Sequence, residues 1–191
     1  YVKSFPKLMD KIRGFRKREL VLLCAPSGCG KSTVTSIFAN DFIDAGERVG
    51  CIYLEETKKE TLQRMVAQQL KVNYNKFRND PLGVASEESV RKAYEKIVED
   101  DKLVLLDHFG NLPVNELMNK VKHMHYVSGC SYIVIDHLTL CASGSGTDVD
   151  ERKLLDNVMT ELAAFCASND VCIIAISHIN RTASHDNKPP K

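Results

Sequence analysis

The sequence predicts an α/β fold with a mostly parallel sheet that helices cover on both faces. Five short apolar segments have the length and composition of buried strands, and helical patterns lie between them. The predicted strands are residues 19–24, 49–54, 103–106, 131–136 and 171–177. Strands that alternate with helices in this way form parallel sheets. Because ligands of such sheets bind beyond the carboxyl ends of the strands, the functional residues are expected there.

Five helices are predicted, because apolar residues recur at helical spacing between these strands. They cover residues 33–45, 58–71, 86–100, a segment from 113 through at least 124, and residues 151–167. Ser86 is the expected N-cap of the third helix, and Pro113 suits the start of the fourth. Residues 72–86 show no clear period and are expected to form an irregular connection. Residues 141–150 are expected to form a small flexible loop, and residues 180–191 a mobile tail.

The composition is that of a globular protein. Hydrophobic residues make up 43% of the 191 residues and charged residues 27%, so the chain can bury one substantial core. The formal net charge of +1 gives no overall field that attracts a polyanion, so nucleic-acid contacts must rest on local patches. The seven cysteines are spread singly without a C-x-x-C pair, which favours reduced thiols over disulfides or a zinc site.

No segment has the length of a membrane span. No apolar run approaches the roughly 18 residues that a bilayer requires, and no signal peptide is visible. We therefore expect no membrane partner and a cytoplasmic location. The chain begins with Tyr1 rather than Met, and we expect it to be a piece of a longer protein.

A glycine-bearing loop joins the first predicted strand to the first predicted helix. The loop consists of Ala25, Pro26, Ser27, Gly28, Cys29, Gly30, Lys31, Ser32 and Thr33. Small residues let backbone N–H groups converge on phosphate oxygens, and the helix N-terminus adds partial positive charge. Lys31 is placed to reach the β- and γ-phosphates of a nucleotide, and the Ser32 hydroxyl to ligate Mg²⁺. This is the pattern of a P-loop, with Ala25 where the simplest pattern has glycine.

A carboxylate ends the fourth predicted strand. Asp136 follows the apolar run 132–135, and this order of strands and helices places it beside the P-loop. There it is expected to hold Mg²⁺ together with Ser32, usually through water. The combination indicates an enzyme that hydrolyses ATP or another NTP with Mg²⁺ as its cofactor.

Two further strand ends carry polar side chains whose roles the residues alone leave open. Glu55 and Glu56 follow the second strand, where one carboxylate could polarise the attacking water. The other interpretation is a pair of solvated acids at a helix start. His178 ends the fifth strand, where it could bond a γ-phosphate or could be an ordinary hydrogen-bonded histidine.

Taken in order, these motifs resemble a known family. The resemblance rests on Gly14 with residues 19–22, on the P-loop, and on residues 50–57, 134–137, 150–157 and 176–178. Together they are similar to the RecA-like helicase domain of phage primase–helicases, within the DnaB group and related to Twinkle. The resemblance implies that residues 1–13 form a linker or N-terminal helix. Residues 14–191 would then form a RecA-like NTPase domain that lacks its C-terminal portion.

The resemblance also implies a function. The family forms hexameric rings that hydrolyse NTP at subunit interfaces and translocate along single-stranded DNA during replication. Glu55, rather than Glu56, falls at the position of the catalytic base, and His178 at that of the γ-phosphate sensor. For a phage-encoded protein the location would be the cytoplasm of the bacterial host.

DNA contact is expected from two segments. The loop 141–149, with Ser143 and Gly144, resembles a pore loop that faces DNA. The segment from Asn180 onward, with Arg181 and Lys188, resembles a second DNA-facing loop. The family's arginine finger and last DNA loop, and any primase domain, are missing from these 191 residues.

Two alternative functions stay open at this point. One is a RecA-type ATPase that recombines or remodels DNA without unwinding it. The other is a nucleotide-gated assembly module with little turnover. The suitability of Lys31, Glu55 and Asp136 for hydrolysis argues against the assembly module.

Overall fold

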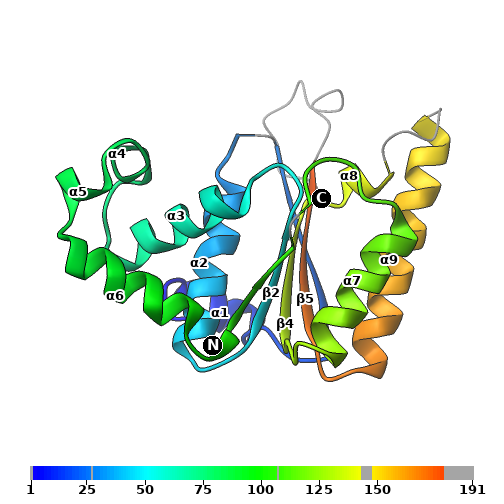
Figure 1. Cartoon of the computed structure of the whole chain (residues 1–191). Coiled ribbons are helices and arrows are strands. Elements are labelled where there is room, and N and C mark those ends of the chain that lie inside the picture. Colours follow the sequence, from blue (N-terminus) through cyan, green and yellow to red (C-terminus); the bar gives the residue numbers. More distant parts are fainter. Residues whose placement is uncertain (1, 27, 107, 143–147, 179–191) are drawn as a thin grey trace.

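The computed structural model describes residues 2–26, 28–106, 108–142 and 148–178 of the chain. Within these residues five strands form one sheet, and every neighbouring pair is parallel (Figure 1). The strands are β1 Leu20–Ala25, β2 Val49–Tyr53, β3 Leu103–Leu105, β4 Tyr132–Asp136 and β5 Cys172–His178, in the spatial order β1-β5-β4-β2-β3. The predicted α/β fold with a parallel sheet is confirmed, and each of the five predicted strands is present.

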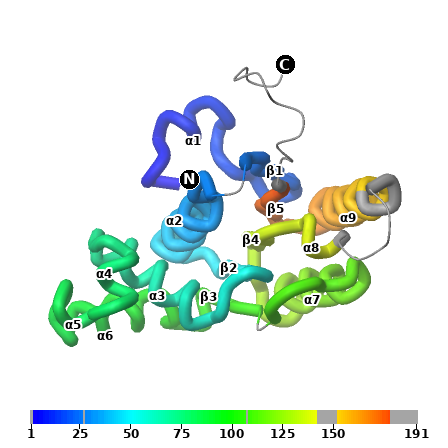
Figure 2. The backbone as a smooth tube through the Cα atoms, turned by 90° about the horizontal axis from the view of Figure 1, so that it is seen from above, coloured from blue at the N-terminus to red at the C-terminus, as the bar shows by residue number. Residues whose placement is uncertain are grey.

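Helices cover both faces of the sheet (Figures 1 and 2). One layer contains α1 Pro6–Ile12, α2 Lys31–Asp44, α3 Lys58–Gln69, α4 Tyr74–Asn79 and α6 Glu87–Val98, and the other contains α7 Val114–Tyr126, α8 Thr139–Ala142 and α9 Asp148–Ser168. The short helix α5 Pro81–Val84 follows α4, and a 3-10 turn, η1 Glu99–Asp101, follows α6. Each layer has its own apolar core against the sheet.

Successive strand residues point to opposite layers. In β2, Cys51 and Tyr53 pack in the layer that contains α2, whereas Ile52 and the following Leu54 pack in the layer that contains α7 and α9. The same alternation separates Tyr132 and Val134 from Ile133 and Ile135 in β4. Because both faces of these central strands are buried, their sequences are apolar throughout rather than alternating with polar residues.

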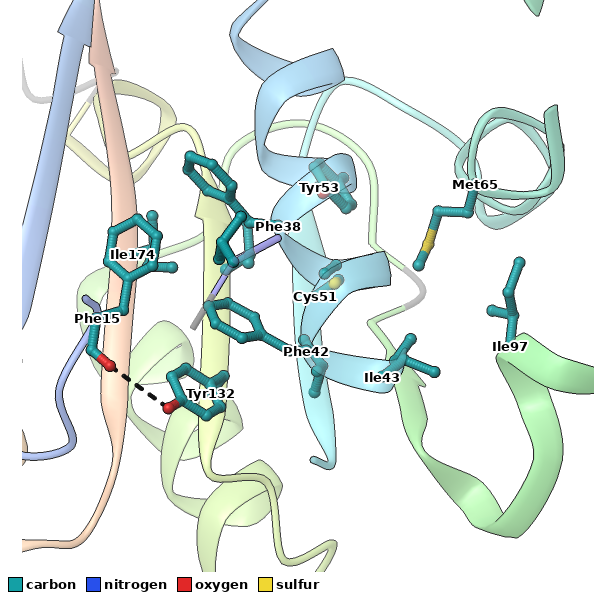
Figure 3. Packing of buried hydrophobic residues seen from close by; sticks show 14 of the residues in the cluster. Phe15, Phe38, Phe42, Ile43, Cys51, Tyr53, Met65, Ile97, Tyr132 and Ile174 are labelled. Atoms are coloured by element: carbon teal, nitrogen blue, oxygen red, sulfur yellow. Dashed lines mark hydrogen bonds between the residues drawn. The ribbon is translucent and has the colours of Figure 1, made fainter. Parts of the chain in front are cut away.

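An aromatic cluster fixes α2 against the sheet (Figure 3). The ring of Phe42 stacks on that of Tyr132, with 3.9 Å between centroids and an angle of 14° between planes. The ring of Phe15 lies 5.0 Å from Phe38, and its carbonyl oxygen accepts a hydrogen bond of 3.5 Å from the Tyr132 hydroxyl. Since α2 follows the P-loop directly, this packing sets the direction in which the P-loop leaves the sheet.

The expectation of an irregular connection over residues 72–86 is wrong. The segment holds α4 and α5, and the side chains of Asn73 and Asp80 cap them by accepting from the backbone N–H groups of Lys76 and Gly83. These helices have six and four residues, which is too short for apolar periodicity to reveal them. Their signal lies in the caps instead. Ser86 caps α6 as predicted, by accepting from the N–H of Ser89.

The expected loop over residues 141–150 is wrong at both ends. Residues 141–142 complete α8, and residues 148–150 already belong to α9. Residues 143–147 and the tail from 179 lie outside the described residues. Among the helices in the described part of the chain, none combines the length and the apolar character that a membrane crossing requires.

The aromatic cluster leads to a stability prediction. Replacing Phe42 by Ala removes its stacking on Tyr132 and leaves a cavity between α2 and the sheet, so we expect the free energy of unfolding to fall by about 3–5 kcal/mol. Phe109 is a matched control because its side chain is 71% exposed, and Phe109→Ala should cost less than about 0.5 kcal/mol. Urea unfolding measures both. Equal losses for the two variants would contradict the packing described above.

Candidate nucleotide-binding site

A polar cleft of about 280 Å³ opens where β1, β2 and β4 end, and we call it the phosphate cleft. Its lining residues come from the P-loop, from the turn after β2, from α3 and from the end of β4. They are Gly28, Gly30, Lys31, Ser32, Thr33, Glu55, Glu56, Arg64 and Asp136. The structure thus brings together most of the residues that the sequence predicts for nucleotide, metal and catalysis. Ser27 lies outside the described residues.

The P-loop backbone depends on its glycines. Gly28 and Gly30 have φ angles of +79° and +86°, in the left-handed region that side chains rarely adopt. A Cβ atom at either position would meet no atom within 4 Å, so the loop surface above both glycines is open. Gly30 is the N-cap of α2, and the first helical residue is Lys31. Open backbone at the start of a 14-residue helix is a suitable cradle for an anion.

The side chain of Lys31 lies back over its own loop. Its Nζ donates hydrogen bonds to the carbonyl oxygens of Ala25 at 2.9 Å and Pro26 at 2.7 Å. Both partners are main-chain oxygens of the P-loop, so the ammonium is held at the mouth of the phosphate cleft. A phosphate oxygen can replace either carbonyl as its acceptor.

Ser32 and Asp136 are in direct contact. The Ser32 hydroxyl donates a hydrogen bond to Oδ2 of Asp136, across a separation of 104 residues. Asp136 is buried, and its main-chain oxygen accepts from the N–H of Leu54 at 2.8 Å, which anchors it to the segment after β2. A hydroxyl and a carboxylate are hard oxygen donors, and this donor set fits Mg²⁺. Among the described residues, no group of three or more His, Cys, Asp and Glu side chains forms a metal cage. Mg²⁺ commonly uses one or two protein ligands plus substrate phosphates.

The two carboxylates after β2 have different surroundings. Oε1 of Glu56 accepts from Nη2 of Arg64 at 2.6 Å, and the two side chains are only 15% and 11% exposed. The side chain of Glu55 is 61% exposed, and its Oε1 lies 3.1 Å from Nε2 of His137. Glu56 is therefore held in a buried ion pair, whereas Glu55 faces the phosphate cleft with a carboxylate that solvent and ligands can reach.

Arg64 was not predicted as a site residue. Its guanidinium lies 5.3 Å from the ring centre of Tyr74, and its Nη1 is buried with no hydrogen-bond partner among the described residues. Burial by itself lowers the pKa of Arg64, but the hydrogen bond and negative charge of Glu56 outweigh this effect and raise that pKa. An arginine on a helix is usually solvated, so the sequence carries no sign that this one is buried at the cleft.

His137 was also missed as a neighbour of Glu55. It directly follows Asp136 and is buried, although histidine at that position has no distinctive spacing to any other motif. His178 is the last residue of β5, in register with Ala25 at the start of the P-loop. The segments expected to bind DNA, with Ser143, Gly144, Arg181 and Lys188, lie outside the described residues.

Comparison with known proteins identifies the family. Residues 2–191 match the family described as the DnaB-like helicase C terminal domain. The chain is 32% identical over 173 residues to the DNA helicase/primase of Enterobacteria phage T3, which covers 90% of this chain and 30% of that relative.

Two solved structures share the fold and confirm the RecA-like architecture. The first is the ATPase domain of another protein, which superposes with a TM-score of 0.80 at 23% identity and covers 98% of this chain and 68% of that one. The second is a DnaB-like replicative helicase, solved in a study of its interactions with primase, which gives 0.79 at 23% identity and covers 98% and 46%. With the family model matching nearly the whole chain, the protein belongs to the DnaB-like helicase C-terminal domain family.

Proposed function

We propose that this chain is the NTP-hydrolysing motor domain of a replicative DNA helicase. The observation that carries the proposal is the phosphate cleft, where the P-loop, Asp136 and Glu55 meet at the carboxyl ends of three strands. Family membership supports the same reaction. The chain spans 30% of the phage T3 relative, so the activity and partners of the whole protein are part of this proposal.

Substrate binding begins at the P-loop. Backbone N–H groups from Gly28 to Thr33 bind the phosphates, and the Lys31 ammonium exchanges the Ala25 and Pro26 carbonyls for β- and γ-phosphate oxygens. Ser32 and Asp136 hold Mg²⁺, which offsets the negative charge of the phosphates when it is bound. Their contact in this structure keeps both oxygens at one place before the substrate arrives.

Hydrolysis then needs a group that orients water in line with the γ-phosphate. Glu55 takes this role, because its carboxylate is accessible at the phosphate cleft and Glu56 is already bound to Arg64. The buried Nη1 of Arg64 provides a donor for a phosphate oxygen. His178, beside Ala25 in the sheet, is proposed as the sensor of the γ-phosphate.

The remaining partners follow from the family. We propose a homo-oligomeric ring, hexameric by analogy, that surrounds single-stranded DNA in the cytoplasm of a bacterial host. Ser143 and Gly144 on one segment and Arg181 and Lys188 on another would contact the DNA backbone, and the net charge of +1 makes that contact local. A recombination ATPase is the second candidate. Unwinding of a 5′-tailed fork by the assembled protein separates the two.

The first test removes the P-loop ammonium. Lys31→Ala should abolish tight binding of a fluorescent non-hydrolysable NTP analogue, because the phosphates lose their charged partner. Lys122→Ala is the matched control, since Lys122 is exposed on α7 in the opposite layer and should leave affinity unchanged. Unchanged affinity in the Lys31 variant would sink the assignment of the nucleotide site.

The second test separates the two carboxylates. In protein that hydrolyses NTP, Glu55→Gln should keep nucleotide binding but lower kcat by about a hundredfold or more, because the base is removed. Glu56→Gln should keep much of the turnover. It should also lower the free energy of unfolding by about 1.5–3 kcal/mol, because the buried Arg64 loses its charged acceptor. If only the Glu56 variant loses turnover, the base has been assigned to the wrong carboxylate.

The third test uses a thiol in the P-loop. Cys24 and Cys29 are exposed, whereas the other five cysteines are buried. Burial raises the pKa of Cys130 to about 11 and that of Cys141 to about 12, so these thiols stay protonated and unreactive at neutral pH.

N-ethylmaleimide should therefore label Cys24 and Cys29 first. Saturating Mg²⁺ and non-hydrolysable NTP should slow labelling of Cys29 by about tenfold or more, because bound phosphates cover the P-loop. Cys24, on β1, serves as the internal control with an unchanged rate. Peptide mass spectrometry measures both sites, and equal labelling of Cys29 with and without nucleotide would contradict phosphate binding at this loop.

A further inference from the structure

His137 occupies a rigid position at the end of β4. The residue before it is anchored by the hydrogen bond of 2.8 Å from Leu54 N–H to the Asp136 carbonyl. The residue after it is anchored by the hydrogen bond of 2.9 Å from Leu138 N–H to the carbonyl of Ile176. Backbone bonds to strand ends on both sides thus flank His137, and the residue is only 5% exposed. Its ring has little freedom to move.

Glu55 is in the opposite situation. It lies in the turn between β2 and α3, and its side chain is 61% exposed. Among the described residues, His137 is the one side chain that Glu55 contacts by an ion pair or hydrogen bond, with 3.1 Å between Nε2 and Oε1. An ionised carboxylate only accepts hydrogen bonds, so Nε2 of His137 carries the proton and donates it.

The two residues come together because β2 and β4 are neighbours in the sheet. Tyr53 and Asp136 are in register, so the residues just beyond them meet above the same strand ends. Asp136 and His137 are consecutive and have different partners, since Asp136 accepts from Ser32 and His137 contacts Glu55. One strand end therefore holds both the proposed metal-binding carboxylate and the proposed base.

We propose that His137 is a positioning residue for Glu55 and that it holds the carboxylate in the orientation needed to activate water. This inference rests on the role of Glu55 proposed above. A flexible glutamate side chain samples many rotamers, and only a few aim an oxygen at the attacking water. A donor on a rigid, buried ring restricts Glu55 before the substrate binds, so the restriction appears in turnover and not in nucleotide affinity.

The experiment compares donor-free and donor-bearing variants in protein that hydrolyses NTP. H137F keeps the bulk of a ring but removes the donor, and it should lower kcat by about ten- to a hundredfold with KM changed less than about threefold. H137Q carries an amide N–H₂ near the place of Nε2 and should restore kcat to within several-fold of the parent. H123F is the matched control, because His123 is exposed on α7, and it should leave kcat unchanged.

A double-variant cycle ties the effect to Glu55. In the E55Q background, H137F should cause little further loss of kcat, because the group that His137 orients is already inactive. Thermal unfolding of each variant identifies loss of folding. If H137F unfolds at a lower temperature than the parent, H137L is used as the donor-free variant, with the same expected loss.

Several results would overturn the inference. A parental or higher kcat for the donor-free variant shows that the contact does not position the base. Equal losses in H137Q and H137F point to packing alone, and so does an additive loss in the E55Q background. If E55Q itself keeps full turnover, the proposed base is wrong and the inference falls with it. If E55Q loses turnover while H137F does not, the base stands and only the role of His137 is rejected.

Discussion

The hydrogen bond from Ser32 to Asp136 is the contact on which the phosphate cleft depends. It joins the first turn of α2 to the end of β4, two segments 104 residues apart in sequence. Because Asp136 is buried and α2 is fixed by its aromatic packing on the sheet, neither partner can move far from the other. The oxygens suited to Mg²⁺ are thus preassembled by the fold, and little reorganisation is needed when the substrate arrives.

The position of β4 at the centre of the sheet explains why so much polar chemistry gathers at its end. β4 pairs with β2 on one side and β5 on the other, so the chain just after it contacts the ends of both. Asp136 and His137 can then serve different partners, while β5 brings its last residue beside Ala25 of the P-loop. Parallel strands make this possible, because all their carboxyl ends lie along one edge.

Burial gives two adjacent glutamates different tasks. Glu56 is enclosed with Arg64, and a buried ion pair of this kind holds a structure in place because separating the charges leaves one of them uncompensated. Glu55 stays accessible and is held only through His137. A guanidinium with one end bound to Glu56 and the other end unpartnered at the phosphate cleft also gives α3 a route by which it can respond to the phosphates.

The sequence by itself determined the parallel α/β fold, the P-loop and Asp136, because buried strands, glycine turns and strand-end acids leave local signals in composition and spacing. The short helices α4 and α5 escaped, since six and four residues show no period. The partners of Glu55 and Glu56 were decided only by the tertiary structure. Adjacent residues share the same local sequence, so nothing local distinguishes them. Which one meets Arg64 and which meets His137 depends on how α3 and β4 pack beside β2, a consequence of long-range register that no short stretch of sequence records.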